Sequence, residues 1–218
     1  MALNKLKFNS LNVTPTAGKT IGFNSSANGL EATLSGGSMV FIKKLTASSD
    51  STLNFVNGSS DVVLDSTYKE YLFLFKDIHP ADDNTKLQVG FRDGSTDYDA
   101  TKTSSVFQSL HDEADSTTAL QYEGGLDLAQ STSAQALTTG VGNDNDQCAS
   151  GILHLFNPSS TTFVKHYIAR CQVLNNSDYS VEHYTAGYCN VTAAIDAVQF
   201  SMTSGNIDAG TITLYGIN

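Results

Sequence analysis

The side chains best suited to metal binding or proton transfer are the histidines, and their spacing argues against both roles. They stand at positions 79, 111, 154, 166 and 183, and no two are separated by two or four residues. Compact metal motifs place two histidines at such short separations. His154 and His166 lie in segments with a strand pattern, so either could project from a sheet face toward a ligand. A satisfied or merely exposed imidazole is the favoured interpretation.

One acidic segment resembles the start of a calcium-binding loop. Residues 142–146 read Gly-Asn-Asp-Asn-Asp, which supplies oxygen ligands at alternate positions. The calcium loop also needs glycine at its sixth position and glutamate at its twelfth, where this chain has Ala149 and Leu155. The segment therefore predicts a turn, and no metal site is predicted.

The common catalytic motifs are absent from the sequence. No nucleophile elbow, phosphate-binding loop, dinucleotide fingerprint or HExxH helix occurs. A carboxylate pair for glycoside hydrolysis depends on spatial separation and stays open as a weaker alternative, although the chain has no tryptophan to stack on sugar rings. The sequence predicts a protein that is not an enzyme, with no catalytic residues and no cofactor.

The net charge of −10 is unevenly distributed along the 218 residues. Residues 1–60 carry an excess of lysine, whereas residues 61–146 hold sixteen acids and five bases. Nucleic-acid binding draws its affinity from clustered Lys and Arg, so a nucleic-acid partner is not expected. The acidic third of the chain is interpreted as a solvated surface.

The three cysteines, Cys148, Cys171 and Cys189, are too widely spaced for a CxxC motif. Their odd number leaves at least one thiol unpaired. Buried, reduced thiols are expected, and one disulfide stays open because the sequence does not choose its partners.

No segment is expected to enter a membrane. The longest apolar run, Tyr71 to Phe75, is far shorter than the roughly 18 residues that a spanning helix requires. Residues 1–10 contain two lysines but no apolar core, so they do not resemble a signal peptide. We expect the protein to remain where it is made or to leave by another route.

Short β-rich segments bounded by Gly, Asn, Asp or Ser follow one another from residue 39 onward, which predicts an all-β sandwich and under about 15% helix. An open β-barrel is the alternative architecture. The predicted strands are 39–45, 52–56, 62–65, 69–76, 86–92, 151–156, 163–173, 181–189, 195–202 and 211–215.

Alternation within these strands predicts the core. Residues 211–215 read Thr-Ile-Thr-Leu-Tyr, which places the two aliphatic side chains on one face, and residues 195–202 and 211–215 read as a strand, loop and strand returning like a hairpin. Residues 71–75 are apolar on both faces, which indicates a central strand covered on each side or a subunit contact. The expected core residues are Leu72, Leu74, Val89, Leu153, Leu155, Val198, Phe200, Ile212 and Leu214.

Residues 93–150 have the weakest pattern. They are rich in Asp, Ser and Thr, and long loops with one or two strands are expected there, with a short helix over 126–137. Loops of this length are usually functional.

The first 38 residues are predicted to form an arm or linker, separate from a domain over 39–218. Apolar side chains are scattered through it without a regular period, and the run from residue 24 to 38 is small, polar and glycine-rich. Such a segment can gain order by laying its apolar residues along a partner. An extra edge strand on the sandwich is the alternative. The candidate docking residues are Lys5, Lys7, Phe8, Lys19 and Phe23.

The C-terminal part of the chain resembles a known protein family. The resemblance rests on residues 151–162 (GILHLFNPSSTT), 195–200 (IDAVQF) and 204–217 (SGNIDAGTITLYGI), in this order and spacing. These segments are similar to the ending of jelly-roll virion structural proteins of tailed, notably marine, bacteriophages. The match is strongest over residues 150–218, and residues 1–60 match nothing in the family.

The resemblance implies an antiparallel jelly-roll sandwich and a structural role on the surface of a virion assembled in the host cytoplasm. A capsid decoration or head-fibre subunit docked through the arm is the expectation, and a receptor- or carbohydrate-binding module of a tail fibre, using residues 93–150, is the alternative. The expected partners are other capsid or tail proteins and further copies of the chain, with a trimer preferred. A host-surface glycan is a further candidate ligand.

Overall fold

The computed structural model describes residues 20–23, 26, 28–33 and 38–218, and the chain divides into two compact units, residues 1–40 and 41–218. In the first unit, strands β1 (Thr20–Phe23) and β2 (Leu30–Thr33) form an antiparallel pair. The alternative for the arm was a single edge strand on the sandwich, so the sequence pattern did not indicate a separate pair of strands.

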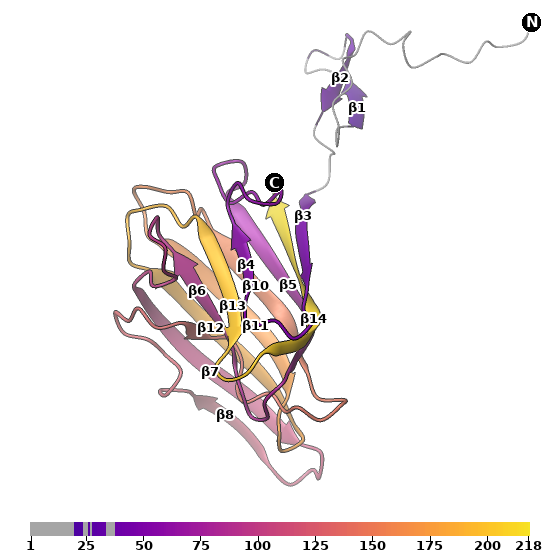
Figure 1. Ribbon diagram of the computed structural model, residues 1–218, viewed down its shortest axis with the longest axis vertical. Helices are drawn as coiled ribbons and strands as arrows, with labels where there is room; N and C mark the ends of the chain where they lie inside the picture. Colours follow the sequence, from indigo (N-terminus) through magenta and orange to yellow (C-terminus); the bar gives the residue numbers. More distant parts are fainter. Residues whose placement is uncertain (1–19, 24–25, 27, 34–37) are drawn as a thin grey trace, which may run out of the picture. The chain divides into compact units, whose positions relative to one another are not determined.

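The other described strands form two antiparallel sheets that pack against each other as a sandwich (Figure 1). The larger sheet has the order β3-β14-β5-β10-β11-β12-β7-β8. Its strands are β3 (Met39–Thr46), β14 (Ile207–Ile217), β5 (Glu70–Pro80), β10 (Ala149–Phe156), β11 (Lys165–Leu174), β12 (Tyr179–Cys189), β7 (Lys102–Asp112) and β8 (Thr118–Tyr122).

The smaller sheet has the order β4-β13-β6-β9. Its strands are β4 (Leu53–Val56), β13 (Ala197–Met202), β6 (Leu87–Arg92) and β9 (Gln135–Ala136). The two sheets share no strand and their edges do not join, which excludes the open-barrel alternative.

The path of the chain between the sheets is regular. Strands β3, β5, β10 and β14 lie in the larger sheet, and β4, β6, β9 and β13 lie in the smaller one. Consecutive members of this set alternate between the layers, except that β6 and β9 both lie in the smaller sheet. Their orders, β3-β14-β5-β10 and β4-β13-β6-β9, are consistent with the double-sheet arrangement of a jelly roll. The C-terminal pair β13 and β14 accordingly lies in opposite sheets, so the expected hairpin-like return is instead a crossing between layers.

Two antiparallel strand pairs enlarge the larger sheet. The pair β11 and β12 follows β10 in the chain, and the pair β7 and β8 follows β6; both extend the sheet beyond β10. Residues 93–150 therefore contain the eleven-residue strand β7 together with β8 and β9, where long loops with one or two strands were expected. The polar residues of β7 concealed its strand pattern, because Ser, Thr and Gln alternate there with few aliphatic side chains.

Two other local predictions are wrong. Residues 126–137 contain no helix and end in β9, because Leu126 to Gln135 run as a loop in which the Gln135 amide donates a hydrogen bond to the Leu126 carbonyl at 2.9 Å. Residues 62–65 form no strand, although Val62 and Leu64 are buried. In the described part of the chain, no helix is long and apolar enough to span a bilayer.

The core lies between the sheets and is densest around four phenylalanines. Phe73 and Phe75 from β5 contact Phe200 of β13 with ring centroids 5.3 and 5.2 Å apart, and Phe55 of β4 lies 5.3 Å from Phe73. All four side chains are buried. These edge-to-face contacts join β5 of the larger sheet to β4 and β13 of the smaller sheet, and they fix how the layers pack.

Eight of the nine predicted core residues are buried, and Leu74 is the exception, with 39% of its surface exposed. Tyr71, Phe73 and Phe75 point into the sandwich, so the intervening Leu72 and Leu74 point to the opposite side of the sheet. Leu72 is buried on that side, whereas Leu74 is not. The two apolar faces of this strand predict a strand covered on each side or a subunit contact, and within one chain only the inner side is covered.

Candidate interaction face

The side of the larger sheet that faces away from the smaller sheet is called the outer face here, and most of the exposed apolar surface of residues 41–218 lies on it. The smaller sheet packs on the inner side, which explains why alternate residues of the large sheet are buried. On the outer side the alternation would normally place polar residues. The exposed large apolar side chains found there are instead Phe41, Leu74, Phe107, Leu120, Tyr122 and Ile168.

The strand register aligns an aromatic row across the outer face. Arg170 of β11 is paired with Tyr184 of β12, which is paired with Phe107 of β7, which is paired with Tyr122 of β8. The rings of Phe107 and Tyr184 are stacked, with centroids 4.6 Å apart and planes inclined by 7°. The Arg170 guanidinium lies 5.4 Å from the Tyr184 ring centroid. This row presents flat rings to the outside of the sheet.

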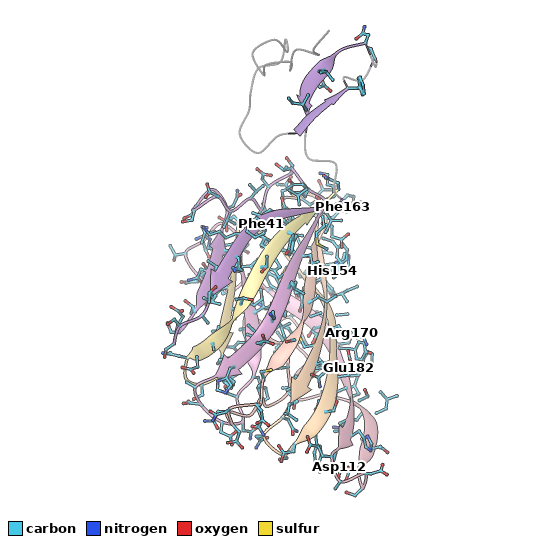
Figure 2. All side chains as sticks on the ribbon, turned by 90° about the vertical axis from the view of Figure 1, so that its right-hand side faces the viewer. Phe41, Asp112, His154, Phe163, Arg170 and Glu182 are labelled. Atoms are coloured by element: carbon cyan, nitrogen blue, oxygen red, sulfur yellow. The ribbon has the colours of Figure 1, made fainter. Side chains whose placement is uncertain are left out.

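The charged side chains of the outer face are paired with one another. Arg170 forms an ion pair with Glu182, which raises the pKa of its guanidinium further above its ordinary range. His154 of β10 hydrogen-bonds Glu70 of β5 through Nδ1. Figure 2 shows His154, Arg170 and Glu182 following one another along the large sheet. The face therefore combines apolar surface with locally balanced charge.

Two shallow hollows indent the outer face on either side of Ile168. One, of about 420 Å³, is lined by apolar and aromatic side chains together with two charged ones: Ile152, His154, Phe156, Tyr184, Glu70 and Arg170. The other, of about 490 Å³, lies over the small side chains of Ser105 and Ala186 and extends to Tyr188. Ile168 borders both hollows and is half exposed, so it stands as a ridge between them.

The structure places the two strand histidines as the sequence pattern suggested, on a sheet face. His154 contacts Phe156 and Glu70, and His166 lies next to Tyr188 with ring centroids 6.1 Å apart. His79 donates a hydrogen bond from Nε2 to the Asp144 carbonyl oxygen, and His111 contacts Asp115. Within residues 20–23, 26, 28–33 and 38–218, no three His, Cys, Asp or Glu side chains gather in a way that would hold a metal ion.

The acidic segment at residues 142–146 forms a turn, as predicted. The Gln147 amide donates to the Asp144 carbonyl at 2.9 Å, and the Asn143 side chain donates to the Ala81 carbonyl at 3.2 Å. These bonds tie the turn to the start of the loop after β5.

The three cysteines are free thiols in the structure. Burial raises the pKa of Cys171 and of Cys189 to about 12 each, and it also raises the pKa of the partly buried Cys148. Because the thiolate is the reactive form, all three are poor nucleophiles at neutral pH. Their role is packing.

Sequence patterns did not indicate the two buried lysines, Lys102 and Lys165. Both face inward and are paired in register with Cys189, and neither side chain reaches solvent. The Lys102 ammonium donates to the Ala100 carbonyl at 2.6 Å, and Lys165 donates to the carbonyls of Val191 and Ala193. Burial lowers the pKa of both. A lysine inside a strand is normally interpreted as exposed, so only the loop carbonyls above it reveal this role.

Of the candidate docking residues in the arm, Lys5, Lys7, Phe8 and Lys19 lie outside the described residues. Phe23 ends β1, and its side chain is largely exposed.

Comparison of the chain with protein-family models, curated proteins and solved structures finds no match.

Proposed function

We propose that this chain is a non-enzymatic structural protein of a bacteriophage virion, displayed as a capsid decoration or head-fibre subunit. The observation that carries the proposal is where the three family-like segments lie. Residues 151–162, 195–200 and 204–217 contain most of β10, β13 and β14, which are interior strands of the two sheets. The resemblance therefore covers the framework of the sandwich and not only its loops.

The division of the chain supports docking through the arm. Residues 41–218 form one compact unit, and the buried residues of the described part of the chain lie within it. The arm carries three lysines and one glutamate, a charge opposite to that of the whole chain. It is thus suited to a partner surface that the acidic sandwich would itself avoid.

A second candidate function, receptor or glycan binding on a tail fibre, draws on the exposed aromatic rings of the outer face. Phe107 and Tyr122 come from residues 93–150, the region expected to make such a contact. Flat exposed rings are suited to stacking against the apolar faces of sugars. In this alternative, purified full-length chain binds host cells or their surface glycans in the absence of other virion proteins.

Removing residues 2–38 tests the proposed docking. Particles from a phage whose gene for this chain is disrupted are mixed with either the full chain or the shortened chain, and cosedimentation is measured. We expect the full chain to bind and the shortened chain to fold with an almost unchanged thermal midpoint but not to bind.

Two results would contradict the proposal. If the full chain does not cosediment with the particles, it is not a component added to their surface. If the shortened chain unfolds or aggregates, the arm belongs to the sandwich, and its docking role is wrong.

A further inference from the structure

The outer face exposes large apolar side chains across the full width of the larger sheet. Monomeric proteins rarely expose contiguous apolar patches larger than a few hundred Å². Here apolar or aromatic side chains extend from Phe41 near one edge of the sheet, through Leu74 and Ile168, to Phe107 and Leu120 near the other. Phe41 also contacts Tyr215 of β14, with ring centroids 6.1 Å apart, so the edge strand shares in the same surface.

The available area matches that of a stable protein interface. Eight strands spaced about 4.8 Å apart give a width of about 34 Å, and eight residues along a strand give about 26 Å, or about 900 Å² in projection. Stable interfaces bury about 800 Å² on each partner. A partner that covers the outer face would therefore find a surface of sufficient size.

The charge of the outer face indicates the chemistry of its partner. On the central strands β10, β11 and β12, the outward-pointing acid and base are Glu182 and Arg170, which form an ion pair. On β5, Glu70 contacts His154 and Lys76 contacts Asp77, so these charges are also paired locally. The acidic excess of the chain, −10 overall, lies elsewhere. A highly charged partner of either sign would therefore gain little electrostatic attraction from the outer face. A second copy, which would be repelled by other acidic surfaces, can approach at this balanced face.

The relief of the face is suited to contact between identical surfaces. Ile168 projects between two hollows, and Leu74 and Phe107 also project, so ridges and depressions occur on the same patch. When two identical surfaces pack against each other, each must carry both the projecting side chains and the hollows that receive them. Arg170 and Glu182 already satisfy one another, so burying them in such a contact leaves no uncompensated charge.

We propose that the outer face of the larger sheet is the self-association surface of this chain, covered in the assembled protein by a second copy. Ile168 lies at its centre and packs into the hollows of the neighbouring copy. This inference does not depend on the proposed virion role, because it rests on the sandwich alone.

The test compares two apolar residues with similar exposure in different places. Ile168→Asp puts a charge at the centre of the outer face, where 51% of the side chain is exposed. Phe163→Asp does the same at a loop residue before β11 that is 70% exposed and lines neither hollow. Figure 2 shows Phe163 at the end of the sheet, away from Arg170 and Glu182. Molar mass is measured by sedimentation equilibrium on the full chain, with circular dichroism as the check of folding.

We expect the unmodified chain to have twice its 23.2 kDa mass, and Ile168→Asp to weaken association by about 30-fold or more, as for a central interface residue. Phe163→Asp should leave association unchanged. If Ile168→Asp does not fold, Ile168→Thr, which keeps the β-branched shape, should weaken association in the same direction. The proposal is overturned if the unmodified chain is monomeric at about 100 µM, if both aspartate variants weaken association equally, or if folded Ile168 variants associate like the unmodified chain.

Discussion

Replacing Phe73 with alanine is expected to lower the free energy of unfolding by about 3–5 kcal/mol, the usual cost of removing a buried aromatic ring. Phe73 is fully buried and contacts Phe55 and Phe200, both of which belong to the opposite sheet. The substitution therefore leaves a cavity at the junction of the two layers. Urea unfolding followed by circular dichroism measures the change.

The neighbouring residue provides a matched control on the same strand. Leu74→Ala removes an aliphatic side chain from the outer face, where it is already partly in water, and should cost less than about 1 kcal/mol in the monomer. The comparison is made on monomeric protein, because Leu74 belongs to the proposed self-association surface. Equal losses for the two variants would mean that the sheet is packed on both sides, contrary to the sandwich described here.

Acidification is expected to destabilise the fold through His183. This imidazole is fully buried on β12 and faces Gln108 of β7 and Thr185. Burial lowers the pKa of His183 from 6.5 to about 4. Between pH 6.5 and pH 4, this imidazole therefore binds a proton in the unfolded chain but not in the folded chain. Stability is therefore complete above pH 6.5 and falls by roughly 3 kcal/mol as the pH decreases to 4.

The His183→Gln variant isolates this effect, because glutamine keeps a polar side chain without titrating. In this variant, residue 183 should no longer contribute to the pH dependence of the free energy of unfolding between pH 6.5 and 4. The control variant His111→Gln alters an exposed imidazole on β7, and its free energy of unfolding should decrease with falling pH as in the unmodified chain. Asp112, whose pKa is lowered to about 2 by hydrogen bonds from Ser116 and Thr117, acts at lower pH. If His183→Gln keeps the full slope, another buried group is responsible.

The sequence predicted the framework of the fold where strands alternate strictly. Residues 211–215 and 151–156 show their inward aliphatic side chains in the amino-acid pattern itself, and both segments lie in strands as expected. Residues 102–112 were missed because their inner side carries Lys102, Gln108 and Asp112 in place of aliphatic residues. The local pattern does not show that the loop at residues 128–131 forms hydrogen bonds with this polar strand.

The outer face was only partly predictable. The two apolar faces of residues 71–75 indicated a covered strand or a subunit contact, and the structure exposes Leu74. The aromatic row of Tyr184, Phe107 and Tyr122 depends on the register of three strands. Because these three residues are far apart in the sequence, no local pattern indicates that their rings lie side by side. The surface became visible only when the order of strands in the larger sheet was known.

Antibody labelling of purified virions tests the central claim, a structural role on the phage particle, most directly. Intact particles of the phage that encodes this chain are labelled with gold-tagged antibody against residues 39–218 and imaged by electron microscopy. A virion role as capsid decoration or head fibre predicts gold on the heads, and gold confined to the tails would support the tail-fibre alternative instead. The account would be contradicted if the particles carry no gold and if an immunoblot of denatured virion protein with the same antibody also shows no band of this mass.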